Sequence, residues 1–404
     1  MNYKTLGDYI KKVDNKNKDL KVLNLQGLSM NKEFRKSTSN IVGTDLSKYK
    51  IVKQGQFCCD FMSVIRVHKL PVVLNNLGED VIISPAYVVF EIIDKNIILP
   101  EYLMMWFRRS EFDRYADFRC DSSIRGGFQW EELCEVKLPI PSIEEQNKIV
   151  TQYQIVENKI KVNEQICEKL EATAQSLYKH WFVDFDFPNK NGKPYKSSGG
   201  RMIWNEQLEK DIPEGWKIKN LSEISKIIMG QSPEGESYND KGIGKIFYQG
   251  RTDFGFRIPE VRIYTKEPKR NAKKGDILMS VRAPVGDLNV ADVDCCIGRG
   301  LAAFRSDYNS FIFYLLKDFR NYFNLSEGTG TIFSSINKDE LFNLKVIFCD
   351  EIILNFDEMV GNIERQTINI SKQNQKLSQL RTLLLSQLAA KKNLENMYEK
   401  IRKL

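Results

Sequence analysis

The residue types that most often carry catalysis are few in this sequence, and their spacing does not match the reactions that use them. The two histidines, His68 and His180, lie in dissimilar contexts, so no Ser-His-Asp or Cys-His arrangement is indicated. Asp184 and Asp186 alternate with aromatic residues, which favours solvated carboxylates at a helix end over a metal pair. The Gly-x-x-x-x-Gly-Lys-Ser/Thr motif of P-loops is absent. We therefore expect a chain without a catalytic or metal site of its own.

The composition is that of a soluble globular protein. Its 404 residues suffice for two or three domains, and 42% of them are apolar and 28% charged. No apolar run approaches the ~20 residues that cross a membrane, and the charged N-terminus lacks a secretory signal. The eight cysteines form no Cys-x-x-Cys pair, which favours buried thiols over zinc ligands. We expect a cytoplasmic location and no membrane partner, and the net charge of +7 permits nucleic-acid binding without requiring it.

Two stretches with apolar residues at heptad spacing predict two long helices. The first begins after Pro141, where Ser142 and Glu145 have the spacing of a capping box. Its interleaved rows are Ile149, Val156, Asn163, Leu170 and Leu177, and Tyr153, Ile160, Cys167, Ala174 and Trp181. The second helix has a strong row, Phe356, Ile363, Ile370, Leu377 and Leu384, and a weaker row, Val360, Thr367, Asn374, Arg381 and Leu388. Because each seam needs a partner, we expect the helices to pair antiparallel, while homo-oligomerisation through either seam stays open.

The segments that precede the two helices repeat in the same order along the chain. The matching pairs are Leu6–Ile10 with Leu221–Ser225, Leu25–Gly27 with Tyr248–Gly250, and Lys53–Phe57 with Lys273–Ile277. Short buried strands are predicted at 86–92 and 275–281, and short helices at 101–114 and 310–322. The sequence thus predicts an α/β (α+β) fold of two similar mixed lobes, 1–141 and 215–348, with a linker at 188–214 and long helices at 142–187 and 349–404 that form an antiparallel coiled coil.

Five motifs, together with this duplicated order, resemble the specificity subunit of type I restriction-modification systems. They are Leu138–Gln146 (LPIPSIEEQ), Tyr178–Pro188 (YKHWFVDFDFP), Ile228–Pro233 (IMGQSP), Gly275–Gly286 (GDILMSVRAPVG) and Cys296–Gly300 (CIGRG). The resemblance extends over essentially the whole chain. The first lobe departs from it most, because it lacks the Gly-Gln-Ser-Pro and Arg-Ala-Pro-Val-Gly motifs.

This resemblance implies that each lobe is a target-recognition domain that reads one half of a bipartite, asymmetric site in double-stranded DNA. It also implies two methyltransferase (modification) subunits bound to the helices, and a restriction/translocase subunit. The S-adenosylmethionine, ATP and Mg²⁺ of such a complex would bind to those partner subunits. The chain itself would then be non-catalytic and would hold no cofactor.

Direct reading of bases requires forked or planar polar side chains, with Arg suited to guanine and Gln or Asn to adenine. Glycines beside several such residues are expected to let the backbone approach DNA closely. The candidate DNA contacts in the second lobe are Gln231, Ser232, Tyr248, Gln249, Arg251, Thr252, Arg282, Arg299, Thr329 and Thr331. Those in the first lobe are Asn24, Gln26, Asn31, Arg66, Ser123 and Arg125. Gln26 and Gln249 match across the repeat, since each precedes a glycine.

Two other functions remain open at this point. The helices and lobes would also suit a coiled-coil scaffold or adaptor that binds peptides and reads no DNA. A stand-alone DNA-binding regulator working as a homodimer is the second alternative. Symmetric dimers read palindromes, whereas two divergent lobes in one chain should read an asymmetric site, so the symmetry of the bound DNA distinguishes these cases.

Overall fold

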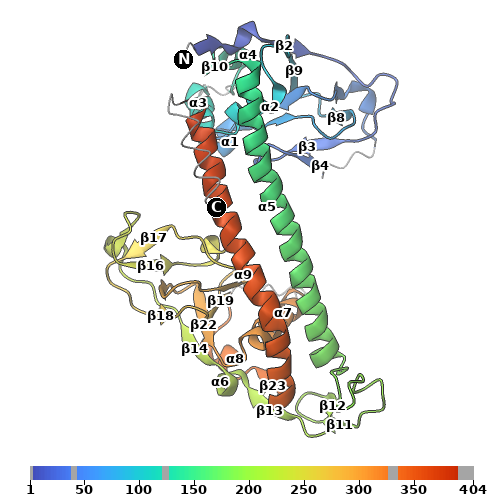
Figure 1. Ribbon diagram of the computed structural model, residues 1–404, viewed down its shortest axis with the longest axis vertical. Coiled ribbons are helices and arrows are strands. Elements are labelled where there is room, and N and C mark those ends of the chain that lie inside the picture. The colour runs from blue at the N-terminus through green and yellow to red at the C-terminus, as the bar shows by residue number, and fades with distance from the viewer. Residues whose placement is uncertain (1–2, 38–42, 121–126, 326–334, 390–404) are drawn as a thin grey trace. The chain divides into compact units, whose positions relative to one another are not determined.

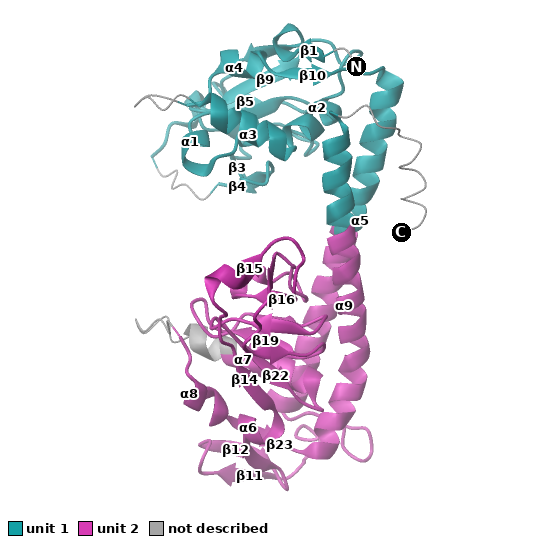
Figure 2. Ribbon diagram, turned by 90° about the vertical axis from the view of Figure 1, so that its left-hand side faces the viewer, with its two compact units in different colours: residues 1–160, 377–404 teal, residues 161–376 magenta. Residues whose placement is uncertain are grey.

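The computed structural model describes residues 3–37, 43–120, 127–325 and 335–389, with the side chains of 320–325 left out (Figure 1). The chain forms two compact units, residues 1–160 with 377–404, and residues 161–376 (Figure 2). The boundary passes through both long helices, α5 (Ile143–Tyr178) and α9 (Asp350–Gln387). Each unit therefore holds one lobe together with part of each helix.

The lobe of the first unit is built on a four-stranded antiparallel sheet in the order β2-β9-β6-β7. Phe57 and Phe90, on neighbouring strands, stack with ring centres 4.9 Å apart, and each packs against Phe107 in a T-shaped arrangement. The elements are β1 (Tyr3–Thr5), η1 (Leu6–Asp8), β2 (Ile10–Val13), β3 (Gln26–Leu28), β4 (Phe34–Lys36), η2 (Leu46–Lys48), β5 (Lys50–Val52), β6 (Phe57–Cys59), α1 (Val64–Val67), β7 (Val72–Leu74), β8 (Val81–Ile83), β9 (Val88–Ile92), α2 (Pro100–Phe107), α3 (Ser110–Arg119), α4 (Trp130–Cys134) and β10 (Lys137–Pro139).

The lobe of the second unit has sheets in the orders β14-β22-β19-β20 and β15-β17-β16-β21-β18. The segment expected as a linker carries the hairpin β11-β12. The elements are η3 (Lys179–Val183, a π-helical turn), β11 (Met202–Asn205), β12 (Lys210–Pro213), β13 (Lys217–Asn220), α6 (Leu221–Ile224), β14 (Lys226–Met229), η4 (Gly235–Ser237), β15 (Tyr238–Asn239), β16 (Lys245–Tyr248), η5 (Arg251–Asp253), β17 (Ile263–Thr265), β18 (Asn271–Ala272), β19 (Ile277–Ser280), β20 (Leu288–Val290), β21 (Cys295–Ile297), β22 (Leu301–Arg305), α7 (Asn309–Leu325), α8 (Lys338–Phe342) and β23 (Lys345–Phe348).

The two lobes share one pattern of strand pairing. The sheet β2-β9-β6-β7 corresponds to β14-β22-β19-β20, and the pairs β1-β10 and β5-β8 correspond to β13-β23 and β18-β21. The turns before β6 and β19 show why one motif occurs in both. Gly55 and Gly275 adopt φ values of +81° and +91°, a conformation that favours glycine. The duplicated mixed fold that the sequence predicts is confirmed.

The two long helices run antiparallel. In the first unit, Tyr153 and Val156 of α5 belong to the same core as Leu380 and Leu384 of α9. In the second unit, Asn163 Nδ2 donates to Asn374 Oδ1 at 2.8 Å, while Phe356 at the start of α9 meets Trp181, with ring centres 5.8 Å apart. Residue numbers thus rise along one helix as they fall along the other, as the predicted coiled coil requires.

Details of the helices differ from the sequence-based expectation. The first long helix ends as an α-helix at Tyr178 and passes into the π turn. The helix expected at 101–114 is two helices, because Arg109 has extended backbone (ψ 140°) and precedes α3 as its N-cap residue. Only half of the expected capping box is present in the hydrogen bonds described, where Ser142 Oγ accepts from the Glu145 N–H at 3.3 Å.

Candidate nucleic-acid interface

Three glycine-bearing segments of the second lobe, 230–232, 248–250 and 298–300, lie side by side. The Gln231 N–H donates to the Ile297 carbonyl at 3.0 Å, and the Gly298 N–H donates to the Tyr248 carbonyl at 2.8 Å. The Arg299 N–H donates to Ser232 Oγ at 3.2 Å. Backbone pairing therefore collects residues from three separate parts of the sequence at one place in the fold.

Most of the candidate side chains at this place reach solvent. We call them the second-lobe polar surface, which comprises Gln231, Ser232, Gln249, Arg251, Thr252, Arg282 and Arg299. All of them are exposed except Ser232, which is half-buried. Arg282 belongs here because the N–H of the preceding Val281 donates to the Gly300 carbonyl at 2.9 Å. Arg251 forms an ion pair with Asp287, so one of the arginines is already held by a carboxylate.

Most glycines of these segments are needed because the loops pack closely on one another, and not because DNA must approach the backbone there. A Cβ on Gly230 would lie 2.1 Å from the Gly298 carbonyl oxygen, and one on Gly298 would lie 2.9 Å from that of Gln249. Gly300 likewise packs on Gln249, at 3.0 Å. Gly250, by contrast, has no heavy atom within 4 Å of such a Cβ. The expectation that glycine lets the backbone approach a ligand is therefore kept for Gly250.

Tyr248 does not fit its expected place among the base contacts. Its side chain is fully buried, and it belongs to the same apolar cluster as Ala272 and Ile297. Burial raises the pKa of its phenol, and no hydrogen-bond partner is found for the hydroxyl in the described part of the chain. The physical reason is that an aromatic residue at the end of β16 lies against the core, where its large apolar ring is removed from water. Tyr248 is therefore left out of the second-lobe polar surface.

Four of the candidate residues, Thr329, Thr331, Ser123 and Arg125, lie outside the described residues. The structure places the other candidates of the first lobe on several elements. Asn24 Nδ2 donates to Glu79 Oε1 at 2.7 Å, and Gln26 Nε2 donates to Asn24 Oδ1 at 2.6 Å. Asn31 is exposed in the turn between β3 and β4. Arg66 is exposed on α1, where Nη2 donates to Ser63 Oγ at 3.2 Å. Only Asn24 and Gln26 of this set are thus shown in contact.

Strand pairing corrects the match between Gln26 and Gln249. In the first lobe Val52 pairs with Val81, and in the second lobe Ala272 pairs with Cys295 at the corresponding place. The residue after Val81, Ile82, therefore corresponds to the residue after Cys295, which is Cys296. Leu25 pairs in parallel with Ile82, and Phe247 pairs in parallel with Cys296. Gln26 therefore corresponds to Tyr248, one residue before Gln249. The sequence match was wrong by one position, because a Gln-Gly dipeptide alone does not determine strand register.

Sequence reasoning missed two side chains that hold the backbone of residues 249–255, at or next to the second-lobe polar surface. Asp253 Oδ2 accepts from the N–H groups of Gln249 and Gly250, at 2.7 and 3.3 Å. Asn289 forms two hydrogen bonds with the backbone of Gly255. The position of Asp253, an acid three residues after Gly250, has the spacing of a capping box, and this spacing is visible in the sequence. Asn289 gave no comparable signal, because its partner lies on a distant segment.

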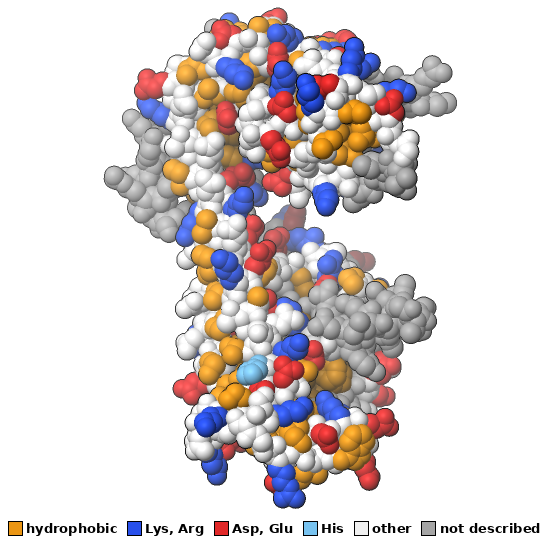
Figure 3. All heavy atoms as spheres, turned by 90° about the vertical axis from the view of Figure 1, so that its right-hand side faces the viewer, with side chains coloured by type: hydrophobic (Ala, Val, Ile, Leu, Met, Phe, Trp, Pro, Cys, Tyr) orange, Lys and Arg blue, Asp and Glu red, His pale blue; other side chains and the backbone are white. Residues whose placement is uncertain are grey.

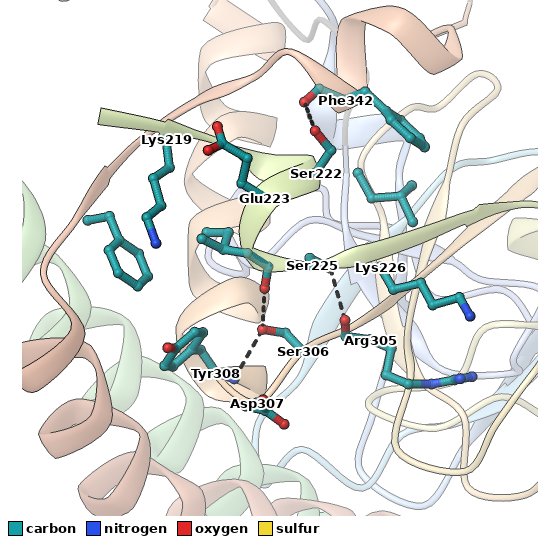
Figure 4. A pocket seen from close by; sticks show the side chains of 13 residues that line it. Lys219, Ser222, Glu223, Ser225, Lys226, Arg305, Ser306, Asp307, Tyr308 and Phe342 are labelled. Atoms are coloured by element: carbon teal, nitrogen blue, oxygen red, sulfur yellow. Dashed lines mark hydrogen bonds between the residues drawn. The ribbon is translucent and has the colours of Figure 1, made fainter. Parts of the chain in front are cut away.

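A hollow of the second lobe lies apart from this surface. It has a volume of about 650 Å³ and is lined by residues of α6, β14, β22 and α8, among others (Figure 4). Ser222 Oγ donates to the Phe342 carbonyl at 2.9 Å, and Lys219 lies over the ring of Phe348. Its lining groups thus already contact one another, and no residue of the second-lobe polar surface lines it.

Charged side chains of both signs are mixed on the surface, and the described residues contain no cluster of metal-ligating side chains. Lys and Arg side chains alternate with Asp and Glu over the described face in Figure 3. Within residues 3–37, 43–120, 127–325 and 335–389, no group of three His, Cys, Asp or Glu side chains is placed to hold a metal ion. None of the helices that the structure describes is long and apolar enough to cross a membrane.

Comparison with known proteins identifies the second lobe. Residues 213–350 match the family model described as the type I restriction modification DNA specificity domain. The putative type I restriction enzyme MjaX specificity subunit of Methanocaldococcus jannaschii is 34% identical over 261 residues, 63% of this chain and 58% of that protein. The match thus spans less than two thirds of that relative's length. The HindI specificity subunit of Haemophilus influenzae is 23% identical over 388 residues, 78% of this chain and 82% of the relative.

One solved structure supports the fold. The S subunit of a type I restriction-modification system from M. genitalium superposes with a TM-score of 0.56 at 12% identity, covering 97% of this chain and 96% of that one. Its fold is therefore shared along nearly the whole chain. Residues 213–350 thus match the type I restriction modification DNA specificity domain, and the chain is similar over 63–78% of its length to type I restriction enzyme specificity subunits.

Proposed function

We propose that this chain is the DNA-specificity subunit of a type I restriction-modification complex, and that each lobe reads one half of a bipartite, asymmetric DNA site. The observation that carries the proposal is the second-lobe polar surface. Within the matched domain, backbone pairing places exposed Gln231, Gln249, Arg251 and Arg299 together. Glutamine and arginine are the side chains that form two hydrogen bonds with adenine and with guanine.

The reading surface is partly organised before DNA binds. Asp253 fixes the backbone at Gln249, and Asp287 holds the guanidinium of Arg251. An arginine that is already oriented loses less conformational entropy when it binds guanine. Because the ion pair of Arg251 must at least partly give way to a base, Asp287 would also disfavour a base that offers no acceptor in return. This would raise specificity more than affinity.

We propose separate roles for the lobes and for the helices. Residues 1–141 and 215–348 would be the target-recognition domains, joined by the linker at 188–214. The helical regions 142–187 and 349–404 would dock two methyltransferase subunits, and a restriction/translocase subunit would complete the complex in the cytoplasm. The S-adenosylmethionine, ATP and Mg²⁺ chemistry would belong to these partners, so this chain would contribute recognition and no catalytic group.

Methylome sequencing of the host tests this function. We expect a methyladenine motif with two separated, unlike halves, which disappears when the gene for this chain is deleted and returns on complementation. A second complementation should use the gene for the double variant Gln249→Ala, Arg251→Ala. This variant should still fold and support methylation, but at a motif with relaxed base preference. A palindromic methyladenine motif would contradict the reading of two unlike half-sites. An unchanged methylome after deletion would contradict the proposal as a whole and would favour the scaffold or the stand-alone regulator.

A further inference from the structure

A buried arginine, Arg257, connects the segment 249–253 of the second lobe, which carries Gln249 and Arg251, to both long helices. Arg257 is only 2% exposed, and its guanidinium forms ion pairs with Glu171 of α5 and Glu364 of α9. It also lies over the ring of Phe313, 4.1 Å from the ring centre. A guanidinium is planar and presents its donors in a fixed fork, so two carboxylates and an aromatic face determine both its position and its orientation.

The segment around Arg257 is also held by its backbone. The Val290 N–H donates to the Arg257 carbonyl at 2.8 Å, and Gln375 Nε2 of α9 donates to the Pro259 carbonyl at 3.1 Å. Gly255 exchanges hydrogen bonds of 3.1 and 3.0 Å with the side chain of Asn289. Residues 255–259 are therefore attached to one sheet of the lobe and to the helices at the same time.

This attachment reaches the reading residues through Asp253. The buried carboxylate accepts from the Gln249 N–H at 2.7 Å through Oδ2, and from Arg262 Nε at 2.9 Å through Oδ1. The Glu260 N–H donates to the Asp253 carbonyl at 2.7 Å. A shift of residues 257–260 would thus move Asp253 and, with it, the backbone that carries Gln249.

The ion pairs form a closed group in which each carboxylate has more than one donor. Glu171 also pairs with Lys317, and Glu364 also accepts from the Tyr314 hydroxyl at 2.6 Å. Two cations and two carboxylates therefore share the site. Loss of one partner of a buried pair is most costly when the other charge is left without any partner. Because both glutamates keep a donor without Arg257, a variant at this position is expected to fold.

We propose that Arg257 is a positioning residue for DNA reading by the second lobe, which aligns the segment 249–253 against the helix-borne carboxylates Glu171 and Glu364. The proposal rests on the proposed function. Arg257 itself is buried and contacts no DNA. Its effect on reading is indirect, through the placement of Gln249 and Arg251, and is confined to the half-site that the second lobe reads.

The test compares the base preferences of variants of the full-length chain assembled with its modification subunits, selected on duplexes with randomised half-sites. Arg257→Met keeps the length of the side chain and removes the fork. We expect discrimination to fall about tenfold or more at positions of one half-site, where a base read directly is worth ~1–3 kcal/mol, or about 5–150-fold. Discrimination at the other half-site should change less than about twofold, which serves as an internal measure of folding and assembly.

Lys317→Met is the matched control, because it removes the other cation from Glu171 and leaves the segment 255–259 anchored. It should retain both half-sites. Arg257→Lys keeps the charge without the fork and provides a milder variant if Arg257→Met does not fold; it should show the same one-sided loss. Equal loss at both half-sites, or full discrimination in both Arg257 variants, overturns the role of Arg257 alone. An unsubstituted complex without any base preference overturns the proposed function as well.

Discussion

Arg305 of β22 donates two hydrogen bonds of 2.7 Å to Asp276, the residue directly before β19, from Nε to Oδ1 and from Nη2 to Oδ2. Strand pairing places Gln56 and Glu91 at the corresponding positions of the first lobe, where Gln56 Nε2 donates to Glu91 Oε2 at 2.8 Å. Asp276 and Gln56 each also accept from the N–H of the lysine three residues earlier, at 2.8 Å. The two lobes thus keep one bridge between strands but build it from different charges.

The equivalence of these bridges predicts that one can replace the other. Arg305→Met should lower the free energy of unfolding by about 1.5–3 kcal/mol, because the buried carboxylate of Asp276 loses its charged donors. The double variant Asp276→Gln, Arg305→Glu rebuilds the first-lobe bridge and should recover most of that loss. Urea denaturation of the full chain measures both. A double variant no more stable than Arg305→Met would show that the two bridges are not interchangeable.

If the second-lobe polar surface reads bases, substitution of its exposed side chains should reduce base discrimination, whereas substitution of a buried neighbour should not. Gln249→Ala or Arg251→Ala should each cost about 1–3 kcal/mol of discrimination, confined to one half-site. Tyr248→Phe is the control, since it changes the neighbouring residue while keeping the buried ring. Competition binding with single-base substitutions in each half-site gives the values. If Tyr248→Phe relaxed the base preference as much as Gln249→Ala, the assignment of the surface would be wrong.

A half-buried carboxyl on α9, that of Asp357, predicts a pH dependence of stability. Burial raises the pKa of Asp357 from 3.8 to about 6, although its carboxylate accepts from the Phe311 N–H at 2.7 Å. Between about pH 4 and 6 the folded protein binds this proton more tightly than the unfolded chain does. The contribution of Asp357 to the free energy of unfolding therefore falls as the pH rises through that window and is constant above it.

Asp357→Asn removes this charge and keeps an oxygen that can accept from Phe311. We expect its melting temperature to exceed that of the unsubstituted protein at pH 7.5, with the difference shrinking towards pH 4. Glu358→Gln, at the exposed neighbouring position, should show no such gain. Differential scanning calorimetry across this pH range makes the comparison, and a difference that does not depend on pH would rule out titration of Asp357 as its cause.

The polar pair in the helix seam is expected to lower the stability of the helix pair while fixing its register and oligomeric state. Asn163 is buried and donates to Asn374 across the two helices. A single polar pair in an apolar seam determines register at a cost in stability. Asn163→Leu with Asn374→Leu should therefore raise the melting temperature and permit additional oligomers, seen by light scattering after size-exclusion chromatography. A more stable variant that remains in one oligomeric state would show that the pair does not determine register.

Local patterns in the sequence determined the helices and the repeated order of the lobes. The heptad rows predict long helices with one buried seam each, since apolar residues at this spacing line one face of a helix. Tyr153, Ile160, Cys167 and Ala174 are all buried, as this predicts. The turns at Gly55 and Gly275 could also be recognised, because a positive φ leaves a local mark in the choice of residue.

Only the tertiary structure decided which polar residues meet and which are exposed. Gly298 and Gly230 have neighbours from other strands, so the reason for these glycines is not visible in the adjacent residues. Tyr248 is buried and Gln249 exposed, although the two are consecutive. Arg257 could not be distinguished from a surface arginine, because Glu171 and Glu364 lie far away along the chain. Periodicity reports which face of an element is apolar, whereas the contacts of a loop depend on segments that meet only after the chain has folded.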